Sequence, residues 1–245
     1  MPDPYNSYEF YPQTLEVRVT ARLMRVAILS SGGKDSSAAW WWAMCKGWDI
    51  ECLVTVIITG DDSWMFQIPG TDIVENQAEL AGLDWLSVTS EGIQEQEILD
   101  LENKLRDLDI DGLVSGAIRS DYQKSRIELM CERLGIKSWT PLWHQSSIGH
   151  MRGLVSNGFG VMITSVACEG LTEKWIGHIL SEESLDEMEE LSKKYRFNVD
   201  GEGGEYETLI VSGPHLHGSL KISGSTSWDG KRGELKIESV SLIKN

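Results

Sequence analysis

The sequence predicts an α/β protein, with a Rossmann-like parallel sheet covered by helices on both faces and a smaller C-terminal α+β domain. Three observations favour this fold class. Short apolar runs alternate with helix-like segments as far as about residue 143. A pair of glycines directly follows the first apolar run, where a strand would lead into a helix. Beyond residue 143 the alternation gives way to a helix, a loop rich in Gly and Glu, and strand-like pieces.

In the first part of the chain, apolar β-branched runs predict strands, and apolar residues spaced by three and four predict helices. The expected strands are 25–30, 52–59, 85–88 and 112–117, and residues 161–166 predict another buried strand. The expected helices run from the glycine pair to about residue 46, over 73–81, over 98–108 and around 127–134. Gly82 and Gly135 follow two of these helices and are predicted C-caps, because glycine accepts a left-handed backbone.

The C-terminal part has its own pattern. Ser184 and Glu187 have the spacing of a capping box, which predicts that a helix begins at Ser184. Leu185, Met188 and Leu191 then lie on one face of that helix. Strands are expected at 209–211, 220–223 and 235–242, and a domain boundary is expected near Trp143.

Residues 1–23 differ from the rest of the chain. They lack a basic region followed by an apolar one, so they do not resemble a signal peptide. Because Met24 directly precedes the first strand, we expect these residues to be an extension or a mis-set translation start. Residues 15–20 alternate apolar and polar side chains, so an edge strand is the open alternative.

Composition excludes several classes of protein. Hydrophobic residues make up 41% and charged residues 24% of the 245 residues, which is typical of a globular chain rather than a disordered one. No stretch approaches the roughly 20 apolar residues of a membrane span, so no membrane partner is expected. The net charge of −16 argues against binding free nucleic acid, since the basic clusters are confined to 193–196 and 231–232.

Four cysteines are scattered along the chain at Cys45, Cys52, Cys131 and Cys168. There is no CxxC pair and no histidine at zinc-finger spacing, so a zinc site is not expected. Scattered cysteines without a secretion signal fit a reducing, cytoplasmic location, and we expect these thiols to be buried and inert.

The segment SGGKDS, from Ser31 to Ser36, lies between a buried strand and a helix start. The free N–H groups and the dipole of a helix start attract anions, and glycines let the backbone approach a ligand closely. Lys34 adds a cation, and the serine hydroxyls add donors, so the segment suits a phosphate group. Asp35 either holds Mg²⁺ against phosphates or caps the helix.

The octet GEGGEYET at 201–208 packs three glutamates and three glycines around one tyrosine. A solvated acidic turn is one interpretation, because acidic runs are usually just that. The alternative is a shaped loop that presents carboxylates, which the spacing of the glycines and the central aromatic residue favour.

These two motifs carry a family resemblance. The first resembles the SGGxDS loop of the ATP pyrophosphatase, or PP-loop, superfamily, which has a HUP-type Rossmann-like sheet and splits ATP into AMP and pyrophosphate. The second resembles the motif of the diphthine–ammonia ligase (diphthamide synthase) family, which joins a PP-loop domain to a smaller domain carrying EGGEYET. The resemblance implies an ATP-binding domain over 24–143 and a substrate-binding domain over 144–245.

Shorter segments add to the resemblance. Residues 115–126 are similar to the family's GAIxSxYQxxRxE block, 141–143 to its PLW, and 169–177 to its EGL…WLG stretch. The chain also departs from the family. Gln67 and Gly70 replace a His and an Asn in an MFHTPN-like segment, and His178 stands where an Arg often follows WLG.

The resemblance implies an ATP-dependent amidation of the diphthine carboxylate on elongation factor 2. ATP and Mg²⁺ would form an acyl-adenylate, and ammonium would supply the nitrogen, giving diphthamide, AMP and pyrophosphate. The residues implied in catalysis are Lys34, Asp35, Glu205 and Glu207, with Asp35 also as metal ligand. Those implied in ATP and pyrophosphate binding are Ser31, Gly32, Gly33, Lys34, Asp35, Ser36, Ser115, Gly116 and Ala117. Those implied in substrate binding are Ser120, Tyr122, Gln123, Arg126, Trp143, Glu202, Gly203, Gly204, Tyr206 and Thr208.

The acidic loop then has a physical role. Glu205 and Glu207 either offset the trimethylammonium charge of diphthine or bind ammonium, and Tyr206 or a nearby Trp would add a cation–π contact. Arg126 contacts the nucleotide or the substrate carboxylate, or alternatively forms a surface ion pair.

Two other functions stay open. Another PP-loop adenylating enzyme that modifies RNA would call for a basic face and often paired cysteines. A non-catalytic ATP or AMP sensor would keep the fold but not the chemistry.

The tryptophans at 40–42 point about 100° apart on a helix, so at least one should meet a second element, either the other domain or the partner in a homodimer. His215 and His217 are expected on one face of a strand as structural or surface residues.

Overall fold

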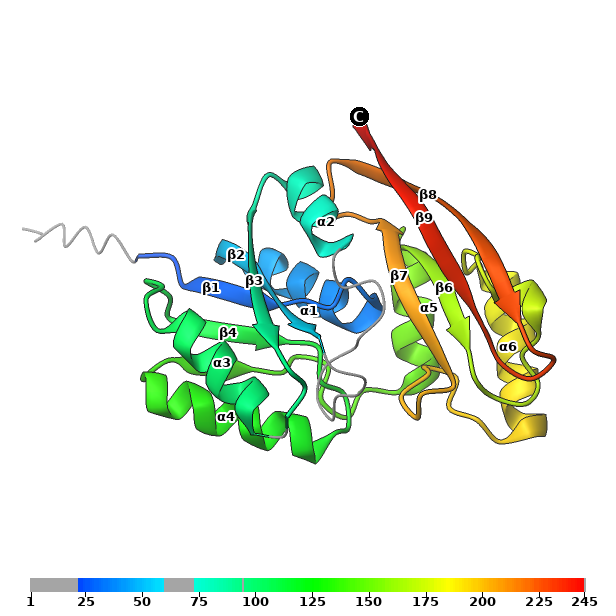
Figure 1. Cartoon of the computed structure of the whole chain (residues 1–245), viewed down its shortest axis with the longest axis horizontal. Helices are drawn as coiled ribbons and strands as arrows, with labels where there is room; N and C mark the ends of the chain where they lie inside the picture. The colour runs from blue at the N-terminus through cyan, green and yellow to red at the C-terminus, as the bar shows by residue number, and fades with distance from the viewer. Residues whose placement is uncertain (1–21, 60–72, 94, 245) are drawn as a thin grey trace, which may run out of the picture.

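The computed structural model describes residues 22–59, 73–93 and 95–244, and it confirms the predicted fold class (Figure 1). A parallel sheet with helices on both faces forms the first unit, and antiparallel strands with further helices form the second. The alternative strand at 15–20 and the departures at Gln67 and Gly70 lie outside the described residues.

The first unit contains five parallel strands in the order β3-β2-β1-β4-β5. Apolar β-branched runs form its central strands, which are buried from both sides. The strands are β1 (Arg25–Leu29), β2 (Asp49–Ile58), β3 (Asp84–Ser90), β4 (Gly112–Ser115) and β5 (Lys137–Trp139). The helices between them are α1 (Lys34–Cys45), α2 (Val74–Ala81), α3 (Gln96–Leu105) and α4 (Asp121–Leu134).

The alternation of side chains along β1 divides the core of this sheet into two layers. Val26 and Ile28 belong to the core that includes residues of α1 and α2. Ala27 belongs to the other core, which includes residues of α3 and α4. The first core continues into the second unit through Val161, Ile163 and other residues, so the two units share one apolar interior.

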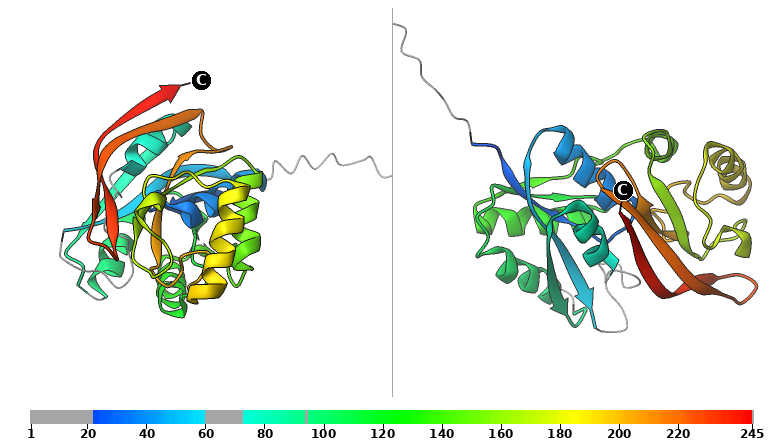
Figure 2. Two further views of the ribbon diagram at one scale, coloured as in Figure 1. Left: turned by 90° about the vertical axis from the view of Figure 1, so that its right-hand side faces the viewer. Right: turned by 90° about the horizontal axis from the view of Figure 1, so that it is seen from above.

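The second unit is built on four antiparallel strands that close on themselves in the order β6-β7-β8-β9. These are β6 (Gly160–Val166), β7 (Tyr206–Ser212), β8 (Gly218–Trp228) and β9 (Gly233–Lys244). Its helices are α5 (Ser147–Ser156), the 3₁₀ turn η2 (Glu173–Trp175) and α6 (Glu182–Tyr195). Figure 2 shows the β8–β9 hairpin lying along α2 of the first unit, where the His217 N–H donates to the Leu80 carbonyl (3.0 Å).

Several elements differ from the sequence-based expectations. The strand at 161–166 is β6, and it pairs antiparallel with β7 rather than extending the parallel sheet, because periodicity alone does not reveal strand direction. The fifth parallel strand is the three-residue β5, which was not predicted, and neither was α5. The capping box lies one turn earlier than expected: Ser181 is the N-cap and Ser184 is its N3 partner.

Other expectations are confirmed. Gly82 and Gly135 end α2 and α4 in the left-handed conformation, with φ of 68° and 72°. The tryptophans of α1 each meet another element: Trp40 contacts His215, Trp41 contacts Phe159, and Trp42 contacts Trp48 and Trp139.

The histidines and cysteines require corrections. His215 and His217 lie in a turn, not a strand, and on opposite sides of it: His215 is buried and His217 is exposed. Burial lowers the pKa of His215 to about 3, so it packs as a neutral ring against Trp40. Cys45 is exposed because it lies in the last turn of α1, whereas burial raises the pKa of Cys52 to about 12 and keeps that thiol inert.

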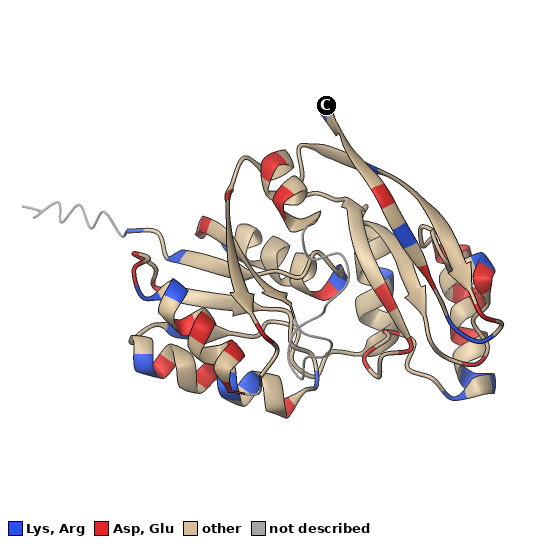
Figure 3. Ribbon diagram, in the orientation of Figure 1, with Lys and Arg blue, Asp and Glu red and all other residues tan. Residues whose placement is uncertain are grey.

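No helix formed by the described residues is long and apolar enough to cross a bilayer. Figure 3 shows Lys and Arg interspersed with Asp and Glu along the described ribbon.

Gly116 sets the distance between β4 and α1. A Cβ atom at this position would lie 2.5 Å from the carbonyl carbon of Asp35 and 2.6 Å from the nitrogen of Ser36. Because both contacts are with backbone, neither can move aside without shifting the first turn of α1.

We therefore expect Gly116→Ala to lower the free energy of unfolding by about 2 kcal/mol in urea denaturation, from overpacking against this turn. Gly153→Ala in α5 is the matched control, since a Cβ there meets nothing within 4 Å. The control should be neutral or slightly stabilising because alanine favours a helix. Equal stability of Gly116→Ala and the wild type would contradict this account of the close approach.

Candidate active site

The SGGKDS segment forms the turn between β1 and α1. Gly32 adopts φ of 80°, which favours glycine, and Gly33 is the N-cap of α1 without a side-chain cap. Ser36 Oγ donates to the Gly33 carbonyl (3.2 Å) and accepts from the Ser31 N–H (3.3 Å). Asp35 lies inside the first turn of α1. Of the two roles expected for it, Mg²⁺ ligand or helix cap, the structure does not show the cap.

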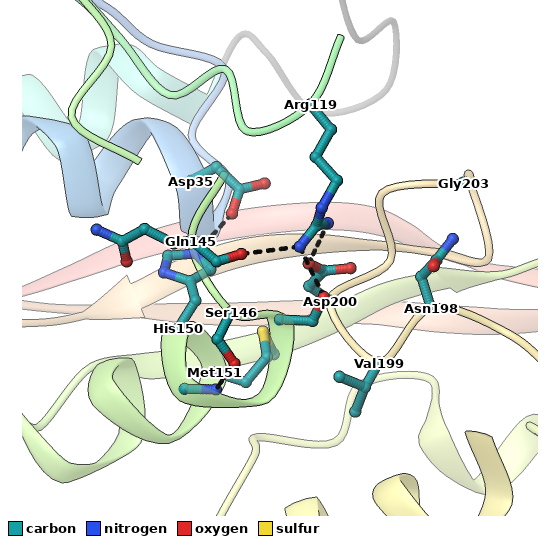
Figure 4. A network of polar contacts seen from close by, with 12 residues as sticks. Asp35, Arg119, Gln145, Ser146, His150, Met151, Asn198, Val199, Asp200 and Gly203 are labelled. Atoms are coloured by element: carbon teal, nitrogen blue, oxygen red, sulfur yellow. Dashed lines mark hydrogen bonds and ion pairs between the residues drawn. The ribbon is translucent and has the colours of Figure 1, made fainter. Parts of the chain in front are cut away.

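Lys34 and Asp35 form a buried ion pair at this helix start. Lys34 Nζ donates to Asp35 Oδ2 (2.8 Å), and the other carboxylate oxygen accepts from His150 Nε2 of α5 (2.8 Å; Figure 4). Burial alone would lower the pKa of Lys34, but the charge and hydrogen bond of Asp35, together with the charges of Glu202 and Asp200, outweigh it and raise the pKa, so the ammonium group persists. Burial opposes ionisation of Asp35 as well, and Lys34 and His150 nonetheless hold its pKa below the usual range.

Strand β7 brings the second motif directly onto this turn. The Ile210 N–H donates to the Gly32 carbonyl (2.9 Å), and Gln77 Nε2 of α2 donates to the same carbonyl (3.0 Å) and to that of Ile210 (2.8 Å). Thr208 Oγ1 accepts the backbone N–H of Lys34 (3.2 Å). Two segments 174 residues apart are therefore hydrogen-bonded at the helix start.

A second buried ion pair joins the end of β4 to the loop before the octet. Arg119 donates to Asp200 Oδ2 (2.7 Å), to the Gln145 carbonyl (2.9 Å) and to Ser147 Oγ (2.8 Å; Figure 4). Asp200 is fully buried. Burial would raise the pKa of Asp200, but the hydrogen bond and charge of Arg119 outweigh it and keep the pKa low.

The octet is a shaped loop rather than a solvated turn. The carboxylate of Glu205 accepts the N–H groups of Asn198 (2.8 Å) and Gly203 (2.7 Å) and the amide of Asn198 (2.8 Å). Tyr206 is buried, its hydroxyl donates to the Val199 carbonyl (2.6 Å), and its ring lies 6.0 Å from Lys34 Nζ. Gly204 is exposed at the tip of this loop.

Glu202 and Glu207 are the carboxylates of the octet that face the Lys34–Asp35 pair. Burial is the main cause that raises the pKa of both groups, and the charge of Asp35 raises them further while Lys34 lowers them. The two side chains are partly buried. Carboxylates whose pKa is raised by burial, next to a buried cation, are typical of functional sites.

The residues after β4 have varied positions. Ser115 Oγ is buried without a hydrogen-bond partner among the described residues, and Ala117 follows Gly116 in the same turn. Ser120 is the N-cap of α4 and accepts the Gln123 N–H (3.3 Å). Ser115 thus lies beside Leu29 at the end of β1, next to the SGGKDS turn, whereas Ser120 and Gln123 start the next helix.

Arg126 forms a surface ion pair, which was one of the two roles expected for it. Its guanidinium lies 2.6 Å from Glu95 and 3.5 Å from the Tyr122 ring centroid. Trp143 is partly buried, 5.2 Å from Lys124 Nζ. The structure therefore gives Tyr122, Arg126 and Trp143 contacts with neighbouring side chains instead of with Lys34 or Asp35.

His150, Arg119, Asp200 and Gln77 belong to this site and were not predicted. Arg119 lies inside the 115–126 block, and the resemblance of that block to the family motif could have identified it as a site residue. His150, Asp200 and Gln77 belong to no recognised motif. Only the tertiary fold brings His150 and Gln77 to the helix start and Asp200 to Arg119.

The described residues contain no group of three or more His, Cys, Asp or Glu side chains that could hold a metal ion by themselves. Asp35 is the predicted metal ligand, and both of its oxygens already have partners. A magnesium ion carried mainly by phosphate oxygens needs only one or two protein carboxylates, so these residues fit a nucleotide-bound ion better than a resident one. His178, the remaining departure, lies 5.6 Å from the Trp175 ring.

Comparisons with known proteins agree with this geometry. Residues 24–138 match the family model described as diphthamide synthase N-terminal domain, and residues 146–243 match that of the diphthamide synthase C-terminal domain. The first match ends within β5, the last strand of the parallel sheet, and the second begins just before α5.

Relatives from other organisms are similar over most of the chain. The diphthine–ammonia ligase of Homo sapiens is 34% identical over 229 residues, covering 82% of this chain and 84% of that protein. The one of Danio rerio is 33% identical, covering 78% and 83%. The one of Schizosaccharomyces pombe is 32% identical over 86% of this chain, but the match spans only 38% of that longer protein.

Among solved structures, a Methanocaldococcus jannaschii protein described as a "predicted subunit of tRNA methyltransferase" is similar at 21% identity and a TM-score of 0.44. The match covers 78% of this chain and 98% of that one. The likeness is too distant to carry an argument about this fold or function.

The Arg119–Asp200 pair generates a prediction about stability. Asp200→Asn should lower the free energy of unfolding by about 2 kcal/mol at neutral pH, because it removes the charge of the buried partner, while Arg119, whose side chain is 35% exposed, can be solvated. The folded-state pKa of Asp200 is depressed, so the stability that its charge contributes is present above the usual carboxyl pKa. That contribution disappears as the pH falls through the lower, folded-state value, so the difference between wild type and variant should shrink in acid.

Urea denaturation of both proteins at neutral pH and at about pH 3 measures this difference. Asp186→Asn is the control, since Asp186 pairs with Arg152 on the surface and its loss should cost little. A difference between wild type and Asp200→Asn that is unchanged in acid would show that the charge of Asp200 does not stabilise the fold.

Proposed function

This chain belongs to the diphthamide synthase family and is a ligase that acts in diphthamide synthesis, and from this premise we propose the reaction in detail. The chain activates the diphthine carboxylate of elongation factor 2 with ATP, forming an acyl-adenylate and releasing pyrophosphate. Ammonia then displaces AMP, giving the amide, diphthamide. Residues 24–143 bind ATP, and residues 144–245 supply the loop that receives the substrate.

The contact between the two motifs supports this proposal most strongly. The hydrogen bond from the Lys34 N–H to Thr208 Oγ1 joins the start of α1 to the octet. It places the buried ammonium group of Lys34 and the helix start next to the glutamates of the octet. A reaction that joins a phosphate ester, a carboxylate and ammonium requires positive and negative groups side by side, and this junction offers both.

In the first step, the residues of the turn bind and orient the triphosphate. Lys34 Nζ and the N–H groups at the start of α1 stabilise the charge that spreads over the phosphates as the carboxylate attacks the α-phosphorus. Asp35 orients Lys34 and is the carboxylate available to a magnesium ion bound by the phosphates. That ion supplies further neutralisation of phosphate charge.

In the second step, the glutamates of the octet handle the nitrogen nucleophile. Glu207 attracts ammonium through its partly desolvated carboxylate and accepts one proton from it, so that ammonia with a free lone pair attacks the acyl carbon. The second proton, released as the amide forms, passes to the phosphate of the departing AMP. Glu202 faces the same pair and adds negative charge. Glu205, whose oxygens are bonded to Asn198 and Gly203, holds the loop in shape rather than touching the reacting atoms.

A turnover assay tests the proposed function. The full chain is mixed with ATP, Mg²⁺, ammonium and diphthine-bearing elongation factor 2, and both AMP release and the mass of the factor are followed. AMP formed in step with an acid-to-amide mass change is the expected result. Transfer of one ¹⁸O atom from a labelled substrate carboxylate to AMP would identify the acyl-adenylate. Bound ATP without AMP or amide would overturn the proposal in favour of a nucleotide sensor.

Lys34→Met should lower the rate of AMP formation by about 10²–10³-fold, because a preorganised charge is removed from the transition state. Steady-state release of AMP measures this loss, and circular dichroism checks that the variant folds. Lys104→Met is the matched control, since Lys104 lies in the last turn of α3, away from the phosphate-binding turn. A variant within a few-fold of wild type would exclude Lys34 from the chemistry.

Glu207→Gln should separate the two steps. Loss of a proton acceptor typically costs about 10²-fold or more, so amide formation should fall by that order. ATP–pyrophosphate exchange, which reports acyl-adenylate formation alone, should stay within a few-fold of wild type. Glu187→Gln, at an exposed pair with Lys174, is the control that leaves both rates unchanged. Equal losses in both steps would contradict a role of Glu207 specific to ammonia.

A further inference from the structure

Strand β9 is paired along one edge and largely unpaired along the other. Its edge toward β8 is paired from end to end. Its other edge pairs with β6 only at Gly233 and Glu234, which lie opposite Val166 and Ser165. From Leu235 onward, no backbone hydrogen bond joins β9 to any element of the described chain except β8.

The neighbouring edge of β6 is already occupied. One edge of β6 pairs with β7, and the other is covered by residues 177–180. There the Ile163 N–H donates to the His178 carbonyl (2.9 Å), and the Leu180 N–H donates to the Val161 carbonyl (2.9 Å). Because this segment stands where β9 would otherwise continue its pairing with β6, the edge of β9 stays open.

The turn of the β8–β9 hairpin fixes which backbone groups point along the open edge. The Asp229 N–H donates to the Arg232 carbonyl (3.0 Å), so these residues form a hydrogen-bonded pair. In an antiparallel ladder such pairs alternate with pairs that exchange no hydrogen bond. The pair Thr226 and Leu235 is the third one after the turn, so it belongs to the second kind. The N–H and C=O groups of Leu235 therefore point away from β8.

A cavity of about 430 Å³ lies against this open edge. Every residue from 234 to 240 lines it, although successive side chains of a strand point to opposite faces. Leu235 and Ile237 are half-buried, whereas Lys236 and Glu238 are exposed. A cavity that touches both sets of side chains reaches β9 along its edge rather than over one face.

The other walls of the cavity connect the open edge with the reaction centre. Ile73 and Asn76 lie on the α2 side, Thr164 belongs to β6, and Ser31 and Thr208 form the end next to the SGGKDS turn. Nine of the fourteen described lining residues are polar or charged, so the cavity suits an occupant that makes hydrogen bonds.

We propose that an extended segment of the protein substrate pairs with the open edge of β9 and so brings its modified side chain to Ser31 and Thr208. This inference rests on the proposed function, which requires a side chain of another protein to reach the SGGKDS turn. An extended segment presents N–H and C=O groups at the same spacing as β9, so the two can pair residue by residue. From 234 to 240 the edge is about 20 Å long, which accommodates about six residues.

A nucleoside and a second copy of the chain are the competing occupants. The donors and acceptors of a base lie on the rim of one ring, so a base leaves most of a strand edge unpaired. A second copy would meet its own net charge of −16, which opposes association. Lys236 and Glu238 beside the open edge are also typical of strands that are protected from pairing with their own copies.

Hydrogen-exchange mass spectrometry of the full chain tests the docking without turnover. Adding diphthine-bearing elongation factor 2 in the absence of ATP should slow exchange over 235–240 by about tenfold or more, because N–H groups on the open edge become hydrogen-bonded. Residues 220–227 of β8 are the matched control, since they lie outside the cavity lining, and their exchange should not change. Slowing caused by ATP alone, or by a higher concentration of the chain alone, would overturn the proposal in favour of a nucleoside or a second copy.

Two substitutions of one residue test the docking in the reaction. Leu235→Pro removes the N–H that points along the open edge, and proline is tolerated on such an edge. Leu235→Ala is the matched control, because it loses the same side-chain packing and keeps the N–H. KM for the diphthine-bearing factor should be about tenfold higher in Leu235→Pro than in Leu235→Ala, since one hydrogen bond is lost and the ring blocks the approach. KM for ATP should be equal in the two variants.

The outcomes separate this inference from the proposed function. Amide formation with equal KM for the factor in both variants, or without slowed exchange over 235–240, would overturn the docking and keep the reaction. Slowed exchange over 235–240 without amide formation would reject the proposed function and keep the docking. Neither slowed exchange nor amide would reject both. If Leu235→Pro does not fold, as circular dichroism would show, the exchange measurement on the wild type still decides.

Discussion

The carbonyl oxygen of Gly32 holds the two halves of the site together. It accepts the N–H of Ile210 from the second unit and the amide of Gln77 from α2, and Gln77 also donates to the Ile210 carbonyl. Gln77 is fully buried, so these hydrogen bonds are made away from water, where an unmade one is costly. They fix β7 relative to the SGGKDS turn, and the positions of Thr208 and Glu207 follow from that register.

Burial gives this junction its electrostatic character. Lys34 keeps its proton and Asp35 loses its own because each is the other's partner in a site that water does not reach freely. Glu202 and Glu207 have no ion-pair partner within the described part of the chain, and desolvation raises their pKa values. In the proposed reaction, the Lys34–Asp35 pair would hold the phosphates and these two carboxylates would face the nitrogen nucleophile. This division of roles suits a reaction in which a phosphate leaves and ammonium must lose protons.

The sequence allowed the first sheet and both motifs to be predicted, since an apolar run, a glycine pair and a helix start are local features. It did not reveal β5, which is only three residues long, or α5, whose two glycines weaken its helical pattern. His150 and Asp200 could not be predicted as site residues because they reach Asp35 and Arg119 through the packing of α5 and the loop before the octet. Local patterns identify a strand such as β6, but its direction depends on pairings far along the chain.

The central claim is that residues from both units form one nucleotide-dependent site. A crystal structure of the chain with ATP and Mg²⁺ tests it most directly. The account predicts phosphate oxygens within hydrogen-bond distance of Lys34 Nζ and of the N–H groups at the start of α1, with the α-phosphate facing Glu207 across Thr208. A triphosphate bound away from β7, with Glu202 and Glu207 turned to solvent, would contradict it.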